Sequence, residues 1–511
     1  MNNSYDNFKE HIGKWKEFLN ASTENTPSNN DDDGQDAGEY VKKDRQLRVV
    51  SEIMMGAVSN PKMLQDFISP EDVTDERISN AKNVSWIQDR LDSHQKQAVL
   101  KALQTDTLCF VQGPPGTGKT TVITEICLQL LRINPTIRIL VCSETHVAVD
   151  NLIEKFYKLQ ESGVVKGLNC FRAYTKDKSS NVAIQEASLE RHIDNYLSAL
   201  QKSRIGVNVV DDLATIFANQ PVNLTKELML NADIVGVTCN SLAKNNFYPN
   251  ESFDYLIFDE VCKATLPEIL IPLSICKRAI LVGDPKQLPP CFLQEDQEIM
   301  ERIDALELEK FMYIDTLFER LPDSKKKFLG NQYRMTNEIG DVISKYFYNS
   351  ELKNGRNVSI PNSILWCDYN PTAKWGNNEG SSPYNLDEVK IVKQLLENLS
   401  KENKKQDVAV ISPYKGQNKK LKDAIKIDGY PNLTIDIDTI DSFQGKDADV
   451  VLFCVTRSVG TLYFFSNPRR MNVALSRAKN LCCIIGYSNF ATQNPTLKSI
   501  YESIPHKTFS V

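Results

Sequence analysis

The chain has 511 residues and a formal net charge of −6, with 41% hydrophobic and 25% charged residues. This length exceeds one ordinary hydrophobic core, so two or three domains are expected. The negative net charge excludes a basic field over the whole surface, so any nucleic-acid site must be a local path. No apolar run matches a signal peptide or a membrane span, so no membrane partner is expected.

The 12 cysteines are scattered and contain no C-x-x-C pair. A zinc site or a disulfide framework is therefore not expected, and a reducing, cytoplasmic setting fits this cysteine usage best.

The first 90 residues show no strand pattern. Residues 1–20 have apolar side chains near helical spacing, which predicts a short amphipathic helix. Residues 21–38 are polar and acidic and predict a disordered linker. Residues 39–90 have a helical pattern that is broken by Pro61 and Pro70.

From Leu91 onward, short apolar runs alternate with helical segments, which is typical of a parallel sheet covered on both faces. A first α/β lobe is predicted over residues 91–322. Within it, residues 151–231 are too long for a plain crossover and predict an inserted helical subdomain. The predicted strands of this lobe are Leu108–Val111, Ile137–Ser143, Ala232–Thr238, Tyr255–Asp259 and Ala279–Gly283.

A second α/β lobe is predicted over residues 323–511, without another glycine-rich phosphate loop. Residues 370–385 are polar and predict a surface excursion. The predicted strands of the second lobe are Val408–Ser412, Ile435–Ile440, Val450–Thr456 and Leu481–Gly486.

The motif GPPGTGKTT, Gly113 to Thr121, lies between an apolar run and an amphipathic run. This strand, loop and helix context makes G-x-x-x-x-G-K-T a phosphate cradle, because glycines let backbone N–H groups face phosphate oxygens at a helix N-terminus. Lys119 is expected to reach the β- and γ-phosphates, and Thr120 to hold Mg²⁺. A chance match in a turn is the alternative for this motif alone.

Two further strand ends carry polar groups. Asp259 follows an apolar run and can hold Mg²⁺, and its neighbour Glu260 can orient or deprotonate an attacking water. Gln287, in the proline-bounded loop GDPKQLPP, is placed to sense the γ-phosphate. Taken singly, the Asp-Glu pair also fits a helix cap, and the loop also fits a plain turn.

These motifs are followed in order by NQYRM, SPYKGQ, TIDSFQGKDAD and NVALSRAK. The ordered set resembles the superfamily 1 helicases, in the 1B branch that includes the RNA helicase of nonsense-mediated decay. The resemblance covers most of the chain from Leu91 onward. It implies two tandem RecA-like lobes, ATP and Mg²⁺ as cofactors, and a nucleotide between the lobes whose hydrolysis moves a single strand of RNA or DNA, 5′ to 3′ in this branch.

The resemblance also implies roles for individual residues. Gln95 is expected to read the adenine, Tyr333 to stack on it, and Arg334 and Arg477 to act as arginine fingers on the γ-phosphate. An ordinary surface ion pair is the alternative for each arginine. The full nucleotide set is Gln95, Gly113, Pro114, Pro115, Gly116, Thr117, Gly118, Lys119, Thr120, Thr121, Tyr333 and Gly445.

By the same resemblance, small hydroxyls and one aromatic line the nucleic-acid path: Ser143, Thr145, Thr238, Tyr414, Thr439 and Ser442. Hydroxyls contact phosphates without reading sequence, and an aromatic ring stacks a base. Helix capping is an equally good interpretation of each hydroxyl. A lysine cluster at Lys415, Lys419, Lys420 and Lys422 and the pair Arg469–Arg470 either add electrostatic grip or form solvated helix faces.

The sequence departs from the family at Lys263, where the family commonly has glutamine, which bears on the coupling between nucleotide and strand. The 90 residues ahead of the first lobe are also not expected to hold the β-barrel and metal-binding module of larger members. Two alternatives therefore stay open. One is an ATPase that clamps or remodels protein–nucleic-acid complexes without unwinding; the other is a nucleotide-controlled module that recruits a protein partner through residues 1–38. A nuclease is not supported.

Overall fold

The computed structural model describes residues 10, 12–20, 33–68, 84–174, 181–202, 215, 221–244, 251–290, 305–306, 318, 325–373, 375, 382–443 and 445–511. The chain divides into two compact units. The first takes in Met1–Gly113, Lys119–Pro285 and Pro289–Phe328. The second takes in Leu329–Val511 together with the short pieces Pro114–Gly118 and Lys286–Leu288. Among the described residues, no helix is long and apolar enough to cross a membrane.

A seven-stranded sheet forms the first unit, in the order β3-β4-β2-β5-β6-β1-β7, and every neighbouring pair is parallel. The central strands are buried along nearly their whole length because helices cover both faces. The strands are β1 (Leu108–Gln112), β2 (Ile139–Ser143), β3 (Cys170–Arg172), β4 (Ile234–Thr238), β5 (Phe253–Phe258), β6 (Cys276–Gly283) and β7 (Lys326–Phe328).

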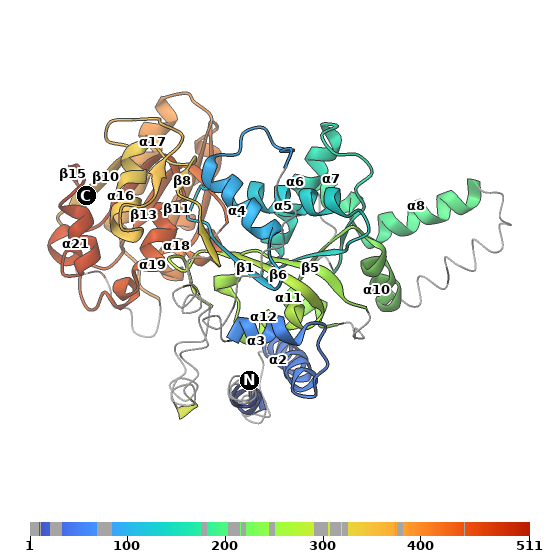
Figure 1. The fold of residues 1–511 in the computed structure, drawn as a ribbon. Coiled ribbons are helices and arrows are strands. Elements are labelled where there is room, and N and C mark those ends of the chain that lie inside the picture. Colours follow the sequence, from blue (N-terminus) through green and yellow to red (C-terminus); the bar gives the residue numbers. More distant parts are fainter. Residues whose placement is uncertain are drawn as a thin grey trace. The chain divides into compact units, whose positions relative to one another are not determined.

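Helices α4 (Ser93–Leu103), α5 (Lys119–Ile133), α6 (His146–Glu161) and α7 (Val182–Glu186) lie on one side of this sheet, and α8 (Leu189–Lys202) extends from its edge (Figure 1). The opposite side carries α2 (Asp33–Met54), α3 (Pro61–Ile68), α11 (Cys239–Leu242) and α12 (Leu266–Ser274) (Figure 1). The described part of this unit also contains α10 (Pro221–Asn231) and the 3₁₀ turn η2 (Val261–Lys263).

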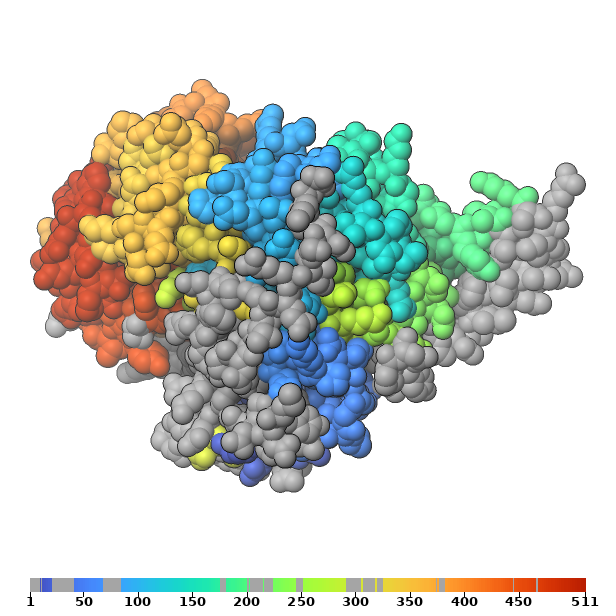
Figure 2. Space-filling model, in the orientation of Figure 1, coloured from blue at the N-terminus to red at the C-terminus, as the bar shows by residue number. Residues whose placement is uncertain are grey.

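The N-terminal segment belongs to the hydrophobic core of the first unit. Residues 12–20 are helical, as predicted, and their apolar side chains Ile12, Trp15 and Phe18 are buried in the same cluster as Phe110 and Leu281 of the sheet. Part of α2 and α3 (blue) also reaches the surface in the space-filling view (Figure 2).

A six-stranded sheet forms the second unit, in the order β12-β11-β13-β14-β10-β15, again with every pair parallel. The strands are β10 (Ile364–Tyr369), β11 (Gln406–Ser412), β12 (Leu433–Thr439), β13 (Ala448–Cys454), β14 (Ala478–Ile485) and β15 (His506–Phe509). A separate parallel pair joins β8 (Asn331–Gln332) to β9 (Lys353–Asn354).

Helices α17 (Leu386–Lys401) and α18 (Lys415–Ala424) bury their apolar stripes against one face of this sheet, in a cluster with Val410 and Leu452. The other helical elements are α16 (Asn337–Phe347), η3 (Ile427–Gly429), η4 (Asp441–Phe443), η5 (Tyr463–Ser466), α19 (Pro468–Leu475), α20 (Ser488–Ala491) and α21 (Pro495–Tyr501).

The two sheets share one strand order. Leaving out β3, the first sheet reads β4-β2-β5-β6-β1-β7 and the second reads β12-β11-β13-β14-β10-β15. When the strands of each sheet are numbered along the chain, both sheets have the order 3-2-4-5-1-6. The predicted α/β class with two similar lobes is confirmed.

The structure differs from the sequence predictions at several elements. Residues 151–231 do not form a separate helical subdomain. They include β3, which is the edge strand of the sheet, and the larger part of α6, which packs on that sheet. Helix α2 begins at Asp33, inside the predicted linker, while residues 21–32 lie outside the described residues. The sequence also missed the strands β7, β8, β9, β10 and β15, which are short or mixed in polarity.

Candidate nucleotide and nucleic-acid sites

The glycine-rich loop joins β1 to α5, as its motif predicts. Gly116 and Gly118 have φ angles of +73° and +79°, a region that is strained for other residues. One hydrogen bond joins the loop to the end of β6, where the Gly113 N–H donates to the Gly283 carbonyl at 2.9 Å. A second lies within the loop, where the Thr117 hydroxyl donates to the Pro114 carbonyl at 2.7 Å. Pro115 is buried, and Thr120 and Thr121 lie in the first turn of α5.

In the first unit, Lys119 lies among the groups predicted to bind phosphate and metal. Its ammonium donates to the Gly113 carbonyl at 3.0 Å and lies 3.5 Å from the Glu260 carboxylate. Asp259 and Glu260 follow β5 and lie beside β6, whose other neighbour is β1. The sheet therefore brings the lysine and both acids together, and their roles with phosphate and metal stay predictions.

Two features mark the acid pair as chemically unusual. Glu260 has a φ angle of +55°, a conformation that non-glycine residues adopt at a cost of about 1–3 kcal/mol and that is common at functional sites. Burial raises the pKa of the Asp259 carboxyl to about 7; the Glu260 charge adds to this, while Lys119 opposes it. The Asp259 carboxylate also accepts the Glu260 N–H at 2.9 Å.

These residues fit Mg²⁺. A buried carboxyl whose pKa is raised by burial and by a neighbouring negative charge gains most from a nearby cation. Mg²⁺ is commonly held by one or two protein oxygens plus phosphates and waters, so Asp259 and the Thr120 hydroxyl are a sufficient protein contribution. No group of three or more His, Cys, Asp or Glu side chains forms an alternative metal site among the described residues.

Gln95 has a structural role that the sequence did not reveal. Its N–H donates to the Asp92 carboxylate at 2.8 Å, and its side-chain oxygen accepts the Asp92 N–H at 3.0 Å, which makes a capping box at the start of α4. The pattern Asp-x-x-Gln is the signal that identifies such a box. The adenine-reading role of Gln95 stays a prediction.

Within the second unit, Tyr333 and Arg334 contact the loop piece Pro114–Gly118. The Tyr333 N–H donates to the Gly116 carbonyl at 2.8 Å, and a Cβ on Gly116 would lie 2.6 Å from the Arg334 Cβ. The Tyr333 side chain is 40% exposed, with Gly355 directly against its ring. Glycine at 355 therefore makes room for the aromatic ring that the sequence assigned to the base.

Both predicted arginine fingers are held by several acceptors. Arg334 Nε lies 3.2 Å from Asp447, and its Nη1 donates to the Ser476 carbonyl at 3.0 Å. Arg477 is 2% exposed, and its guanidinium donates to the carbonyls of Val473 and Lys446 at 2.9 and 3.1 Å.

Gln287, from the piece Lys286–Leu288, accepts from Arg477 Nη2 at 3.2 Å. The predicted γ-phosphate sensor and one predicted finger are therefore direct partners within the second unit. Gly445, whose φ angle is +83°, is exposed in the same unit. Its contact with the nucleotide stays a prediction.

Asp447 contacts the predicted finger Arg334, and Lys479 contacts Asp447; the sequence reasoning assigned neither, although both belong to the quoted motifs. Lys479 Nζ lies 2.6 Å from Asp447. Burial alone would raise the Asp447 pKa, but the nearby Arg334 and Lys479 cations hold it below its usual value. Asp447 therefore stays ionised and orients the Arg334 guanidinium.

The predicted nucleic-acid residues of the first unit lie at the carboxyl ends of neighbouring strands. Ser143 and Thr238 are direct register partners of β2 and β4, and Thr145 caps α6 by accepting the Ala148 N–H at 3.4 Å. The Ser143 hydroxyl is buried without a hydrogen-bond partner, while the Thr238 side chain makes no capping bond although it precedes α11. Helix capping therefore explains Thr145, but it does not explain Ser143 or Thr238.

The second unit repeats this arrangement. Ser412 and Thr439 are register partners at the ends of β11 and β12, and Thr439 lies 3.2 Å from the Ser442 hydroxyl. The Tyr414 hydroxyl accepts from Arg457 Nε at 3.1 Å, and the guanidinium lies 5.4 Å from the ring centroid. Lys415, Lys419 and Lys422 are exposed on α18. Lys263, the departure from the family, ends η2 near Glu260, and its effect on coupling stays a prediction.

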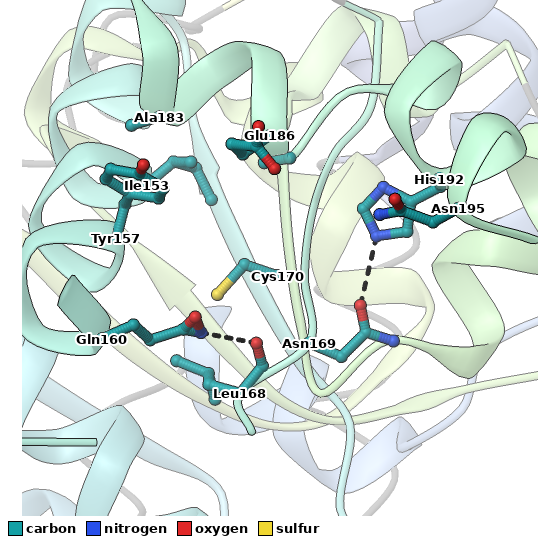
Figure 3. Close-up of a pocket in the computed structure, with 11 residues that line it drawn as sticks. Ile153, Tyr157, Gln160, Leu168, Asn169, Cys170, Ala183, Glu186, His192 and Asn195 are labelled. Carbon is teal, nitrogen blue, oxygen red and sulfur yellow. Dashed lines mark hydrogen bonds between the residues drawn. The ribbon is translucent and has the colours of Figure 1, made fainter. Parts of the chain in front are cut away.

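A separate pocket of about 230 Å³ opens at the amino end of β3, whereas the phosphate loop and the hydroxyls lie at carboxyl ends of strands. Figure 3 shows Cys170 between Tyr157 and Gln160 of α6 and His192 and Asn195 of α8. Its polar groups bond to each other, for example Gln160 to the Leu168 carbonyl at 2.5 Å and His192 to Asn169 at 3.2 Å. This pocket contains none of the sequence-predicted residues.

Comparisons with known proteins agree with the motifs. Two families described as AAA domains match the chain, one over residues 90–216 and 207–295 and the other over residues 313–489. The DNA polymerase alpha-associated DNA helicase A of Saccharomyces cerevisiae is 29% identical over 504 residues, which cover 88% of this chain and 72% of the relative. The ATP-dependent helicase NAM7 of the same yeast is 30% identical over 444 residues, which cover 79% of this chain and 42% of the relative.

Among solved structures, an arterivirus nonstructural protein 10 (helicase) matches with a TM-score of 0.40 and 15% identity, over 79% of this chain and 64% of that one.

Proposed function

We infer that this chain, which belongs to the superfamily 1 helicases, hydrolyses ATP in order to move along single-stranded nucleic acid, 5′ to 3′. The observation that carries the proposal is the grouping of Lys119, Asp259 and Glu260 at the carboxyl ends of β1 and β5. The neighbouring strands β2 and β4 end there in the paired hydroxyls Ser143 and Thr238.

The proposed chemistry follows from the residue types. Lys119 leaves the Gly113 carbonyl and neutralises the β- and γ-phosphates, while the loop N–H groups bind phosphate oxygens. Glu260 orients the attacking water and takes its proton. Arg334 and Arg477 stabilise the charge that develops on the transferred phosphoryl group. Mg²⁺, when bound by Thr120 and Asp259, supplies charge neutralisation at the phosphate oxygens.

Coupling to a strand requires that ATP favour one arrangement of the chain over another, because a ligand shifts an equilibrium only by its differential affinity. Gln287 and Arg477 are the residues proposed to couple the state of the nucleotide to the second unit, since they are hydrogen-bonded to each other. The strand is proposed to contact the hydroxyls at the strand ends of both units and Tyr414.

The decisive experiment is the ATPase rate with single-stranded RNA, with single-stranded DNA, and with neither. Stimulation by at least one strand supports the proposal and identifies the nucleic acid. A rate that neither strand changes would overturn nucleic-acid coupling.

A labelled duplex with a single-stranded 5′ tail then separates the helicase from the clamp. Release of the labelled strand, with none from a 3′-tailed duplex, supports 5′ to 3′ movement. Stimulated hydrolysis without release would support the ATPase that remodels complexes without unwinding. A protein partner of the N-terminal segment and a cytoplasmic location remain predictions.

A further inference from the structure

The segment between β10 and α17 holds a position that matches the phosphate loop. β10 is the first strand of the second sheet along the chain and lies next to last in it, as β1 does in the first. The segment therefore leaves the same strand end that carries the glycine-rich loop in the first unit. Its described residues are 370–373, 375 and 382–385, and the function proposed above uses none of them.

The carboxyl side of this segment is fixed to the first turn of α18. A Cβ at Gly416 would collide with the Ser382 carbonyl oxygen, so glycine permits the close approach. The Gln417 side chain accepts the Asn385 N–H at 2.6 Å and donates to the Asn385 carbonyl at 3.2 Å. Two residues of the SPYKGQ motif thus hold Tyr384 in place beside the helix.

The amino side of the segment is fixed as firmly. Trp375 Nε1 donates to the buried Asp387 carboxylate at 2.9 Å, and Thr372 donates to the same group at 2.8 Å. The Trp375 backbone N–H donates to the Ser458 hydroxyl at 3.0 Å, and its carbonyl accepts the Ser458 N–H at 2.9 Å. Three polar groups, namely the Asp387 carboxylate and the hydroxyl and N–H of Ser458, therefore orient a tryptophan that remains partly exposed.

The two anchored ends bring aromatic rings and a cation together. The Trp375 and Tyr384 centroids are 5.8 Å apart at an interplanar angle of 47°, and Lys420 Nζ lies 5.0 Å from the Tyr384 centroid. Neither ring is fully buried. A tryptophan that is held by its polar edge and is only partly buried can offer its ring to a planar ligand.

This aromatic pair is continuous with the predicted nucleic-acid surface. Ser458 follows Arg457, whose guanidinium bonds the Tyr414 hydroxyl. The Tyr414 ring in turn lies 5.9 Å from Phe464, over which Arg470 is placed at 4.3 Å. The exposed lysines of α18 flank this row, so a local positive field accompanies the rings although the whole chain is acidic.

We propose that Trp375 is a base-stacking site for single-stranded nucleic acid, with Tyr384 supporting its ring and Lys420 close to the adjacent phosphates. Alternating aromatic and basic side chains along one path are the features by which proteins bind single strands without reading sequence. The proposal rests on the proposed function and adds to it a contact formed by the loop at the phosphate-loop position of the second unit.

The test measures the affinity of the full chain for a fluorescent 12-nucleotide strand, of the type that stimulates its ATPase, and for the matching abasic strand. Trp375→Ala should weaken binding of the base-containing strand about tenfold. The same variant should bind the abasic strand as wild type does, because that strand has nothing to stack. Trp375→Phe keeps a ring but loses the bond to Asp387, and should retain most of the affinity.

The controls separate stacking from charge and from folding. Lys420→Gln should weaken binding of both strands, whereas Lys393→Gln, which removes an exposed lysine of α17, should weaken neither. Thermal unfolding of each variant checks that the fold is intact.

Two results would overturn the stacking site while leaving the proposed function standing: undiminished binding by Trp375→Ala, or equal losses for Trp375→Ala and Trp375→Phe. A wild-type chain that neither binds a strand nor responds to one would instead remove the proposed function, and this site with it.

Discussion

The two units build the same sheet and place different chemistry at its carboxyl edge. β5 and β13 occupy equivalent central positions, and each is followed, two residues beyond the strand, by a non-glycine residue with positive φ. These residues are Glu260 at +55° and Thr456 at +74°. Each donates its N–H at 2.9 Å to a side-chain oxygen of an acidic residue, Asp259 in one unit and Glu388 in the other.

The difference lies in what that shared turn supports. In the first unit the turn presents two acids beside Lys119 and the phosphate loop. In the second unit the two equivalent residues, Val455 and Thr456, are uncharged, and the turn is held by the buried Glu388 side chain of α17. The exposed side chains around this turn are arginine, lysine and aromatic. The scaffold thus sets where functional groups project, and the sequence at each strand end decides whether the unit presents the acids and lysine proposed to bind metal and phosphate, or arginines and lysines.

The largest expected effect comes from the first unit. Lys119→Ala should reduce ATP hydrolysis to background, because the phosphate charge loses its main side-chain partner. A steady-state phosphate-release assay measures the rate. Lys166→Ala, an exposed lysine of the same unit, is the matched control. Retained turnover in Lys119→Ala would reject the assignment of the phosphate site.

The second unit should contribute to hydrolysis without being required for ATP binding. Arg477→Lys is expected to lower kcat by about 10³-fold or more, because lysine lacks the planar fork of the guanidinium. ATP affinity, measured with a fluorescent nucleotide, should change little. Lys498→Ala is the control in this unit, and an unaltered kcat would argue against the finger role.

The shared turn predicts that glycine relieves backbone strain at either position, with a loss of activity expected at Glu260. Glycine tolerates positive φ, so Glu260→Gly should stabilise the fold by about 1 kcal/mol. Thr456→Gly should gain less, because it also removes a buried side chain whose hydroxyl is hydrogen-bonded to Ser412. Calorimetric melting measures this. Glu260→Gly should also abolish hydrolysis, since the carboxylate is lost. A lower melting temperature in both variants would contradict the strain at these turns.

The smallest effect expected is on pH dependence. Burial raises the pKa of the Glu388 carboxyl to about 8, above its value in the unfolded chain. The folded state therefore retains a proton that the unfolded state releases, so this group's stabilising contribution is full below pH 4.5 and is lost as pH rises toward 8.

Glu388→Gln keeps an acceptor for the Thr456 N–H and removes this titration. Its melting temperature should fall less than that of wild type between pH 6 and pH 9, and parallel curves for the two proteins would refute the raised pKa.

The sequence was sufficient for features that depend on local patterns. The phosphate loop and the Asp-Glu pair after β5 could be located from the sequence, because each follows an apolar run that forms a buried strand. The hydroxyls at the strand ends were singled out only by the resemblance to the family. Contacts between distant residues could not. The Asp447 link to Arg334 and the Glu388 support of Thr456 join residues far apart in the chain, and only the folded sheet brings them together.

Strand prediction failed where burial is incomplete. β3 is a three-residue edge strand, and β15 consists mostly of exposed residues, so neither has the apolar run that marks the central strands. The start of α2 at Asp33 was missed because its first residues are acidic and polar, a composition that also predicts a linker.

The turn between α7 and α8 covers part of the outer edge of β3. An open parallel sheet ends in unpaired backbone groups that can recruit a strand from another molecule. Here the outward Arg172 N–H donates to the Ala187 carbonyl at 2.7 Å, so the turn between α7 and α8 shields that border. The turn therefore occupies a backbone donor with which a strand of another molecule could otherwise pair, and we expect its removal to lower solubility before it lowers ATPase activity.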